Sequence, residues 1–194
     1  MEPLMHFEGK NILVTGGSRG IGREVAAAFA ERGGRVAVHY LSRRVEAEET
    51  LRRMRGGSHL LVQADLRKPG ELARMTGEVI EAFGRIDILV NNAGIYEQYA
   101  IPEIGYEAWQ EKWRETLEIN LIGAANLCFL VARHMIDTGG GRIVNVSSRG
   151  AFRGEPLAAA YGASKAGLNS LSQSLAQALG PHGISVYAVA PGYV

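Results

Sequence analysis

Short apolar, β-branched runs alternate along the chain with segments whose apolar residues recur at helical spacing. The predicted strands are residues 11–15, 35–40, 59–65, 86–91, 142–147 and 184–190. Between them, apolar residues three or four positions apart predict helices, including residues 44–54, 109–135 and 157–179. Strands that alternate with helices indicate an α/β fold. We expect a single domain over residues 1–194, a doubly wound parallel sheet of the Rossmann type with helices on both faces.

Composition and charge indicate the compartment and the classes of partner to expect. Lys and Arg (21) nearly balance Asp and Glu (20), so no net charge attracts nucleic acid or an anionic membrane. The longest apolar stretch, residues 121–132, contains Asn126 and is too short to span a bilayer. The N-terminus lacks the basic flank and apolar run of a signal peptide, and Cys128 is the only cysteine. We therefore predict a cytoplasmic protein with no nucleic-acid or membrane partner. The five histidines lack metal-ligand spacing, so we predict no metal site.

A glycine-rich turn, Thr-Gly-Gly-Ser-Arg-Gly-Ile-Gly at residues 15–22, follows the first strand. Glycine lets the backbone approach a pyrophosphate, and the N-terminus of the next helix offers free N–H groups. The spacing differs from Gly-x-Gly-x-x-Gly, and tight turns need glycine in any case. Its position at the first strand–helix junction of such a sheet nevertheless favours a nucleotide site.

Tyr161 and Lys165 lie four residues apart in the predicted helix 157–179. On one helix face their Cβ atoms would be roughly 5–6 Å apart. A nearby ammonium lowers the pKa of a phenol, which makes proton transfer feasible near neutral pH. Taken alone, the pair is better interpreted as a surface contact without function, so the other motifs decide.

Several motifs occur together in a fixed order: the turn at 15–22, Asn-Asn-Ala-Gly at 91–94, Ser148, Tyr161 with Lys165, and Pro191-Gly192. From about Gly9 onward, this arrangement resembles the short-chain dehydrogenase/reductase family. It is most similar to the 3-oxoacyl-acyl-carrier-protein reductases and the sugar or steroid dehydrogenases. That resemblance implies hydride transfer between a nicotinamide and a ketone or secondary alcohol.

The resemblance also implies catalytic roles. Tyr161 would be the general acid in carbonyl reduction and the base in alcohol oxidation. Lys165 would lower the pKa of Tyr161 and hydrogen-bond the nicotinamide ribose, and Ser148 would donate to the substrate oxygen. Asn120 would hold a water that relays protons to Lys165. On its own, Asn120 is better interpreted as a polar residue within a helix.

The same resemblance assigns the cofactor site. Asp65 would bind the adenine amino group, although alone it is nearly as well explained as a turn or helix-capping residue. Pro191 and Gly192 would close over the nicotinamide. The predicted cofactor-binding residues are Gly16, Ser18, Arg19, Gly20, Ile21, Gly22, Tyr40, Arg43, Asp65, Leu66, Asn92, Ala93, Gly94, Tyr161, Lys165, Pro191 and Gly192.

The end of the second strand predicts which nicotinamide cofactor is used. An NAD-specific site places an acidic residue about 20 residues beyond the glycine turn. Tyr40 occupies that position, whereas Arg19, Arg43 or Arg44 could meet a 2′-phosphate. We predict a preference for NADP(H), with NAD(H) as the alternative.

We therefore expect an NADP(H)-dependent oxidoreductase, with 3-oxoacyl thioester reduction as one activity. The alternatives are a sugar or steroid alcohol dehydrogenase, an epimerase or dehydratase on the same scaffold, and a non-catalytic nucleotide-sensing domain. The helix over residues 161–179 is apolar on several sides, which indicates burial on several sides. Because the family that the chain resembles pairs two long helices across a two-fold axis, the resemblance then implies a homodimer or homotetramer.

The run at 184–190 is continuously apolar, a pattern typical of a strand buried on both faces and paired on both sides. Members of the family continue beyond this point with a substrate lid and a further strand. We therefore expect the working protein to extend past Val194.

Overall fold

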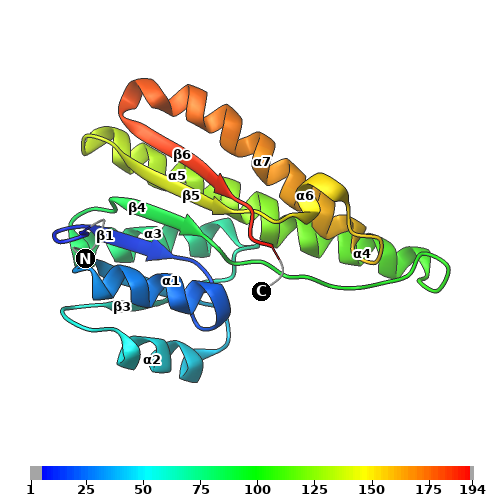
Figure 1. Cartoon of the computed structure of the whole chain (residues 1–194), viewed down its shortest axis with the longest axis horizontal. Coiled ribbons are helices and arrows are strands. Elements are labelled where there is room, and N and C mark those ends of the chain that lie inside the picture. Colours follow the sequence, from blue (N-terminus) through cyan, green and yellow to red (C-terminus); the bar gives the residue numbers. More distant parts are fainter. Residues whose placement is uncertain (1–5, 193–194) are drawn as a thin grey trace.

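The computed structural model describes residues 6–192, so the N-terminal residues and the chain end discussed above lie outside the described part. Six parallel strands form one sheet in the order β3-β2-β1-β4-β5-β6 (Figure 1). They are β1 (Asn11–Val14), β2 (Arg35–Tyr40), β3 (Leu60–Gln63), β4 (Ile88–Asn91), β5 (Gly141–Val146) and β6 (Ile184–Val189). The predicted doubly wound α/β fold is confirmed. The strand order reverses between β1 and β4, which places a ligand-binding crevice at their carboxyl ends.

Helices cover both faces of this sheet. Side chains of α1 (Gly20–Glu31) pack on one face, and α2 (Arg44–Arg53) lies beside α1. The other face is covered by α3 (Pro69–Phe83), α5 (Ala124–Asp137) and α7 (Ala159–Leu179). The remaining helical elements are α4 (Tyr106–Leu117), the π-helical turn η1 (Glu118–Gly123), α6 (Gly150–Arg153) and the 3₁₀ turn η2 (Gly180–His182).

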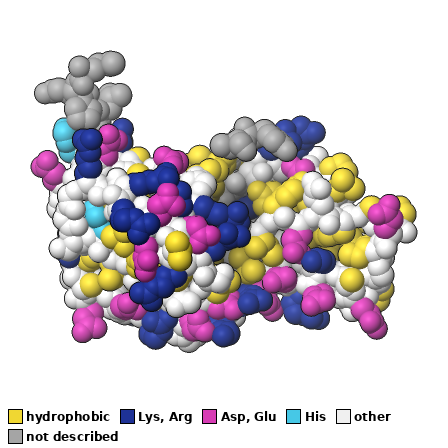
Figure 2. Space-filling view, turned by 90° about the horizontal axis from the view of Figure 1, so that it is seen from below, with side chains coloured by type: hydrophobic (Ala, Val, Ile, Leu, Met, Phe, Trp, Pro, Cys, Tyr) yellow, Lys and Arg dark blue, Asp and Glu magenta, His cyan; other side chains and the backbone are white. Residues whose placement is uncertain are grey.

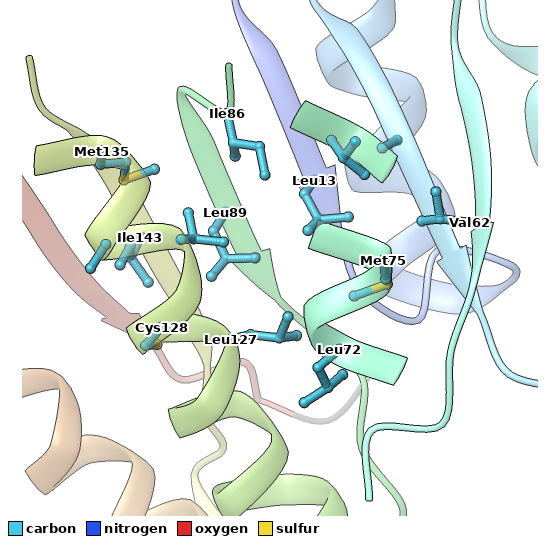
Figure 3. Packing of buried hydrophobic residues seen from close by; sticks show 14 of the residues in the cluster. Leu13, Val62, Leu72, Met75, Ile86, Leu89, Leu127, Cys128, Met135 and Ile143 are labelled. Carbon is cyan, nitrogen blue, oxygen red and sulfur yellow. The ribbon is translucent and has the colours of Figure 1, made fainter. Parts of the chain in front are cut away.

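The core follows the alternation of side chains along the strands. Leu13, Leu89 and Ile143 contribute to the cluster under α3 and α5, whereas Ile12 and Val14 belong to the cluster under α1. Figure 3 shows the larger cluster, in which helix side chains meet strand side chains in one apolar layer. This layer fixes the helices that carry functional side chains relative to the strand ends.

The helix predicted at 109–135 is longer than expected. It runs over Tyr106–Asp137 through η1, and by length and composition alone it could cross a membrane, unlike the predicted stretch 121–132. Here it packs against α3, α7 and β5, which accounts for many of its apolar residues. The π-helical turn was not predicted, and turns of this kind often occur at functional sites.

The expectation that residues 184–190 are buried on both faces is wrong for the described residues. Ile184 and Val186 are buried on the α7 side. Tyr187 and Val189 are 48% and 50% exposed. The long helices that contact β6, α5 and α7, lie on the side of Ile184 and Val186, so the other face is less covered. Pairing is also one-sided, because β6 is the edge strand within residues 6–192 and pairs there with β5 alone.

Candidate functional site

The turn between β1 and α1 is built from glycines at positions that admit no side chain. Gly16 has a φ of +63°, and a Cβ on it would lie 2.9 Å from the Cα of Ala93. A Cβ on Gly22 would lie 2.3 Å from the carbonyl oxygen of Gly16. The helix α1 begins at Gly20 with no side-chain N-cap. The closely folded backbone and the free N–H groups of α1 form a cradle that suits a pyrophosphate.

A cavity of about 540 Å³ opens over this turn, at the carboxyl ends of the four strands β1 to β4. Figure 2 shows the molecule hollowed on this side, with hydrophobic side chains in the hollow and Lys and Arg side chains beside it. The predicted cofactor-binding residues that line the cavity are Gly16, Ser18, Arg19, Gly20, Ile21, Gly22, Tyr40, Arg43, Asp65, Leu66, Asn92, Ala93 and Gly94. The volume and the strand-end position suit a dinucleotide.

Some lining residues were not indicated by the sequence reasoning. They include His39, Leu41, Ser42, Ala64, Ile95 and Ile119. Leu41 and Ala64 directly follow strands, and His39 and Ser42 lie within two residues of the end of β2, so closeness to a strand end was the available signal. Ile119 belongs to the unpredicted π-helical turn, so no local pattern pointed to it.

Thr15 and Asn92 join the exits of β1 and β4. The hydroxyl oxygen of Thr15 accepts hydrogen bonds from the backbone N–H groups of Asn92 and Ala93, each at 3.0 Å. The side-chain amide of Asn92 donates to the carbonyl oxygens of Thr15 and Gly16 at 2.9 and 3.1 Å. These bonds hold the glycine turn against the Asn-Asn-Ala-Gly segment at the point where the strand order reverses.

Asp65 lines the cavity but already has a cationic partner. The guanidinium of Arg67 donates to both of its carboxylate oxygens, with the Nη2–Oδ2 distance at 2.7 Å. The hydrogen bonds from Arg67 hold the pKa of Asp65 below its usual value. An ionised carboxylate can accept several hydrogen bonds, so an adenine amino group remains a compatible further partner.

The arginines predicted to meet a 2′-phosphate differ in their surroundings. Arg43 is about half exposed, and its Nη1 lies 2.9 Å from Oε1 of Glu46. Arg44 is similarly paired with Glu48 at 2.9 Å. Arg19 is exposed at the N-terminus of α1, and no ion pair is recorded for it within residues 6–192. Its guanidinium is therefore the most available of the three cations.

A second cavity, of about 260 Å³, adjoins the first and shares Ile21, Asn92, Gly94 and Ile95 with it. It contains the predicted residues Ser148, Tyr161, Lys165, Pro191 and Gly192. Tyr96, Val146 and Ser147 also line it, and they were not among the predicted site residues. Residues far apart in the sequence thus meet beside the larger cavity.

Tyr161 and Lys165 lie in this second cavity, on the N-terminal part of α7. The ammonium nitrogen of Lys165 is 5.8 Å from the ring centroid of Tyr161 and donates to the carbonyl oxygen of Val146 at 2.8 Å. The Lys165 side chain is buried, and burial lowers its pKa to about 8. A buried amine next to a phenol, in a cavity, is an arrangement suited to proton transfer.

The adjacent serines make different contacts. Ser147 is buried, and its hydroxyl donates to the carbonyl oxygen of Lys165 at 3.3 Å, which ties β5 to α7. The hydroxyl oxygen of Ser148 accepts a hydrogen bond from the N–H of Gly150 at 3.1 Å and lines the cavity. Because Ser148 accepts here, its own hydrogen is available to donate to a ligand oxygen.

Asn120 lies in the π-helical turn, behind the cavities rather than in them. Its Oδ1 accepts from the N–H of Ile95 at 2.8 Å, and its Nδ2 donates to the carbonyl oxygen of Ile95 at 2.9 Å. Nδ2 also lies 3.2 Å from Oγ of Ser164. A Cβ on Gly94 would lie 3.1 Å from Asn120 Oδ1 and 3.5 Å from Lys165 Nζ, so glycine permits this close approach.

No group of three or more His, Cys, Asp or Glu side chains in the described part of the chain could hold a metal ion. The glycine cradle, the strand-end cavity and the polar side chains of the adjoining cavity fit a nicotinamide dinucleotide. The larger cavity would take its adenosine and phosphate portions, and the smaller one its nicotinamide and a substrate.

Comparison with known proteins identifies relatives of this chain. The profile of the family described as short chain dehydrogenase matches residues 10–194. A 3-oxoacyl-[acyl-carrier-protein] reductase FabG of Staphylococcus epidermidis is 37% identical over 187 residues, covering 95% of this chain and 75% of that protein. An uncharacterized oxidoreductase of Thermotoga maritima is 40% identical over 190 residues, covering 97% of this chain and 73% of that protein.

A solved structure has a similar fold. The crystal structure of a dehydrogenase/reductase from Sinorhizobium meliloti superimposes with a TM-score of 0.89 at 34% sequence identity. The match covers 96% of this chain and 73% of that one. The chain thus spans about three quarters of the length of the proteins it resembles.

Proposed function

This chain belongs to the short-chain dehydrogenase/reductase family of oxidoreductases, and we propose that it interconverts a ketone and a secondary alcohol with NADP(H). One observation carries the proposal. The phenol of Tyr161, the amine of Lys165 and the hydroxyl of Ser148 line one cavity, which adjoins a larger cavity built on a glycine cradle.

The chain's own groups have distinct tasks in this reaction. The nicotinamide, when bound, supplies or accepts the hydride. Tyr161 donates its proton to the carbonyl oxygen during reduction and takes a proton from the alcohol during oxidation. The ammonium of Lys165 favours the phenolate by its charge. Ser148 donates a hydrogen bond to the substrate oxygen, where negative charge develops.

Asn120 supports this chemistry from behind the cavity. Its side chain bonds Ile95 and Ser164, and the second lone pair of Oδ1 would accept from a water that relays protons to Lys165. Pro191 and Gly192 would cover the nicotinamide. Asp65, Leu66 and the segment 92–94 would hold the adenosine portion, all from positions on the cavity walls.

A preference for NADP(H) is supported by the absence of an acidic side chain at Tyr40 and by the available cation of Arg19. NAD(H) is the alternative cofactor. The 3-oxoacyl thioesters are the first substrates to test, because a relative with 37% identity carries the name of such a reductase. Sugar or steroid alcohols are the second choice, and the intact Tyr161 and Lys165 disfavour a non-catalytic sensor.

Assembly and location are part of the same proposal. On the long helix, Ile122 is 49% and Phe129 66% exposed, and the adjacent α7 is rich in apolar residues. Pairing of these helices between two copies would cover both, giving a homodimer or homotetramer. The near-neutral charge and the single cysteine support a cytoplasmic location without nucleic-acid or membrane partners.

The test is a panel of ketones and 3-oxoacyl thioesters, with loss of NADPH absorbance as the readout. Tyr161→Phe serves as the matched variant, since it removes one oxygen and leaves the ring. We expect turnover of the variant to fall by roughly 10²–10⁴-fold while NADPH binding is retained. Turnover of the variant within a factor of two of the wild type would overturn the role of Tyr161.

A further inference from the structure

His39, the fifth residue of β2, reaches across to the glycine turn. Its Nδ1 accepts a hydrogen bond of 3.1 Å from the backbone N–H of Gly16, the first glycine of the cradle. Its Nε2 lies 3.0 Å from the carbonyl oxygen of Ala64, at the end of β3. The side chain is 2% exposed and lies on the wall of the larger cavity. One ring therefore joins the exits of three neighbouring strands.

The partners of the ring fix its protonation. A carbonyl oxygen only accepts, so Nε2 must carry a hydrogen. A backbone N–H only donates, so Nδ1 must be bare. Both bonds exist together only in the neutral imidazole with its hydrogen on Nε2. In the imidazolium, a hydrogen on Nδ1 would point at the hydrogen of Gly16, and the turn or the ring would have to move.

We propose that His39 is a positioning residue for the cofactor, which holds the first glycine of the phosphate cradle through its unprotonated Nδ1 and thereby makes cofactor affinity depend on pH. The inference rests on the proposed function, because it takes the cradle to bind NADP(H). The backbone also contributes here, since the N–H of Gly17 donates to the carbonyl oxygen of His39 at 2.9 Å. The side-chain bond is the part that a proton can break.

The groups around the ring determine the pH at which Nδ1 takes up a proton. Burial lowers the pKa of His39, and this outweighs the bond to Ala64 and the charge of Asp65, which raise it. Asp65 is the carboxylate beyond β3, and Arg67 is bonded to it. On the glycine turn and α1 the charged side chains are Arg19, Arg23, Glu24 and Glu31, and the next residue on β2 is Tyr40. The neutral ring is therefore complete at and above a histidine's ordinary pKa of about 6.5, and it is lost as pH falls further, through the lower pKa of the buried ring.

Each of two substitutions keeps one hydrogen bond of the ring and removes the other. In His39→Asn, Oδ1 lies the same number of bonds from Cα as Nδ1 of histidine, so it can accept from Gly16 but cannot reach Ala64. In His39→Gln, the terminal amide corresponds to Nε2, so it can bond Ala64 but leaves Gly16 without its acceptor. Neither amide titrates near neutral pH. The pair therefore tests the contact with Gly16 against a general structural role.

The experiment measures the Kd of NADPH for the full chain by fluorescence titration, from about pH 8 down to about pH 5.5. We expect His39→Asn to bind within about threefold of the wild type at pH 8, and His39→Gln to bind at least about tenfold more weakly. The ratio of wild-type Kd to His39→Asn Kd should rise as pH falls, by at most about tenfold per pH unit for one proton. Titration of the 2′-phosphate cancels in this ratio.

The inference is overturned if the ratio stays constant across this range, or if His39→Gln binds as the wild type does. Thermal unfolding of the ligand-free proteins provides a separate readout. The unfolding midpoint of the wild type should fall below that of His39→Asn as pH drops, because the unfolded chain takes up the proton more readily. If the unfolding midpoints shift in this way but the wild type does not bind NADPH at pH 8, the proposed cofactor and the positioning role are overturned. The His39–Gly16 bond would still be supported by the shift in midpoint.

Discussion

The hydroxyl oxygen of Tyr99 accepts a hydrogen bond of 3.0 Å from the backbone N–H of Ala160. The first N–H groups of a helix have no intrahelical partner, and Ala158, at the N-cap of α7, provides no side-chain cap. Tyr99 therefore caps α7 from a distant loop. Its own N–H donates to the carbonyl oxygen of Leu157 at 2.7 Å. The loop after β4 is thus fixed to the helical turn that carries Tyr161.

Tyr99→Phe tests this relationship. The variant keeps the ring, which packs edge-on against Trp109 with centroids 5.3 Å apart, and removes only the capping oxygen. Loss of the bond should cost about 1 kcal/mol and lower the melting temperature by about 2–4 °C. Looser positioning of Tyr161 should also reduce kcat several-fold, with little change in the KM for NADPH.

A suitable control is Tyr106→Phe, which removes a hydroxyl from an exposed ring whose recorded partner is Gln110. We expect this control to melt and turn over as the wild type does. Equal melting temperatures for Tyr99→Phe and Tyr106→Phe would show that the cap contributes nothing.

The glycine cradle makes a second prediction. Gly22→Ala would place a Cβ 2.3 Å from the carbonyl oxygen of Gly16, a contact that backbone must move to relieve. We expect NADPH affinity to fall by at least about tenfold and the free energy of unfolding to fall by about 1–3 kcal/mol. Fluorescence titration and urea denaturation measure the two effects.

Gly77→Ala is the matched control, because Gly77 lies within α3 and a Cβ there meets nothing within 4 Å. It should raise stability by about 0.4–1 kcal/mol, since alanine reduces the freedom of the unfolded chain. If both alanine variants bound NADPH equally well, the cradle would not be the phosphate site.

The choice between NADPH and NADH gives a third prediction. A hydrogen bond to a charged group contributes about 1.5–3 kcal/mol, or roughly 10- to 150-fold in affinity. Arg19→Ala should therefore reduce kcat/KM for NADPH within this range and leave that for NADH nearly unchanged. Arg43→Ala should have a smaller effect, because Glu46 already neutralises this side chain at 2.9 Å. Equal kcat/KM for both cofactors in the unmutated protein would contradict the preference.

Much of this architecture could be predicted because the deciding signals are local. The strands at 11–14, 35–40 and 141–146 lie within a residue of the predicted ones, since each is a short apolar run between turn residues. The rule that ligands bind at strand ends then directs attention to the glycine turn and residues 92–94. The structure indeed brings these segments to one cavity.

The contacts that were missed depend on partners distant in the sequence. Nothing near Tyr99 indicates that its hydroxyl meets Ala160, and nothing near His39 indicates that its ring meets Gly16. The π-helical turn at 118–123 and the exposed face of β6 have the same origin. They depend on which elements pack together, and a hydrophobic pattern indicates burial without naming the neighbour.

The buried amine of Lys165 leads to a prediction for stability. Burial lowers its pKa from an ordinary 10.5 to about 8. Between these values the unfolded chain binds more protons than the folded one, so this residue makes stability rise with pH from 8 toward 10.5. Its contribution is complete above the unfolded pKa and is lost as pH falls through the folded one. A charged lysine at neutral pH is thus a cost to folding that the proposed catalytic role accounts for.

Lys165→Met removes the titrating group and retains an apolar side chain. It should abolish turnover and also lose the bond to Val146, so its absolute stability combines opposing effects. The pH dependence is free of that ambiguity. Relative to the variant, the wild type should gain about 1.4 kcal/mol of stability per pH unit above pH 8, or about 2 kcal/mol by about pH 9.5. Urea denaturation of both proteins at about pH 7 and about pH 9.5 measures this difference in stability.

Lys68→Met is the control, because its side chain is 64% exposed, and this variant should follow the wild-type curve. Parallel curves for Lys165→Met and the wild type would mean that Lys165 does not titrate in this range, and the account of its burial would be wrong.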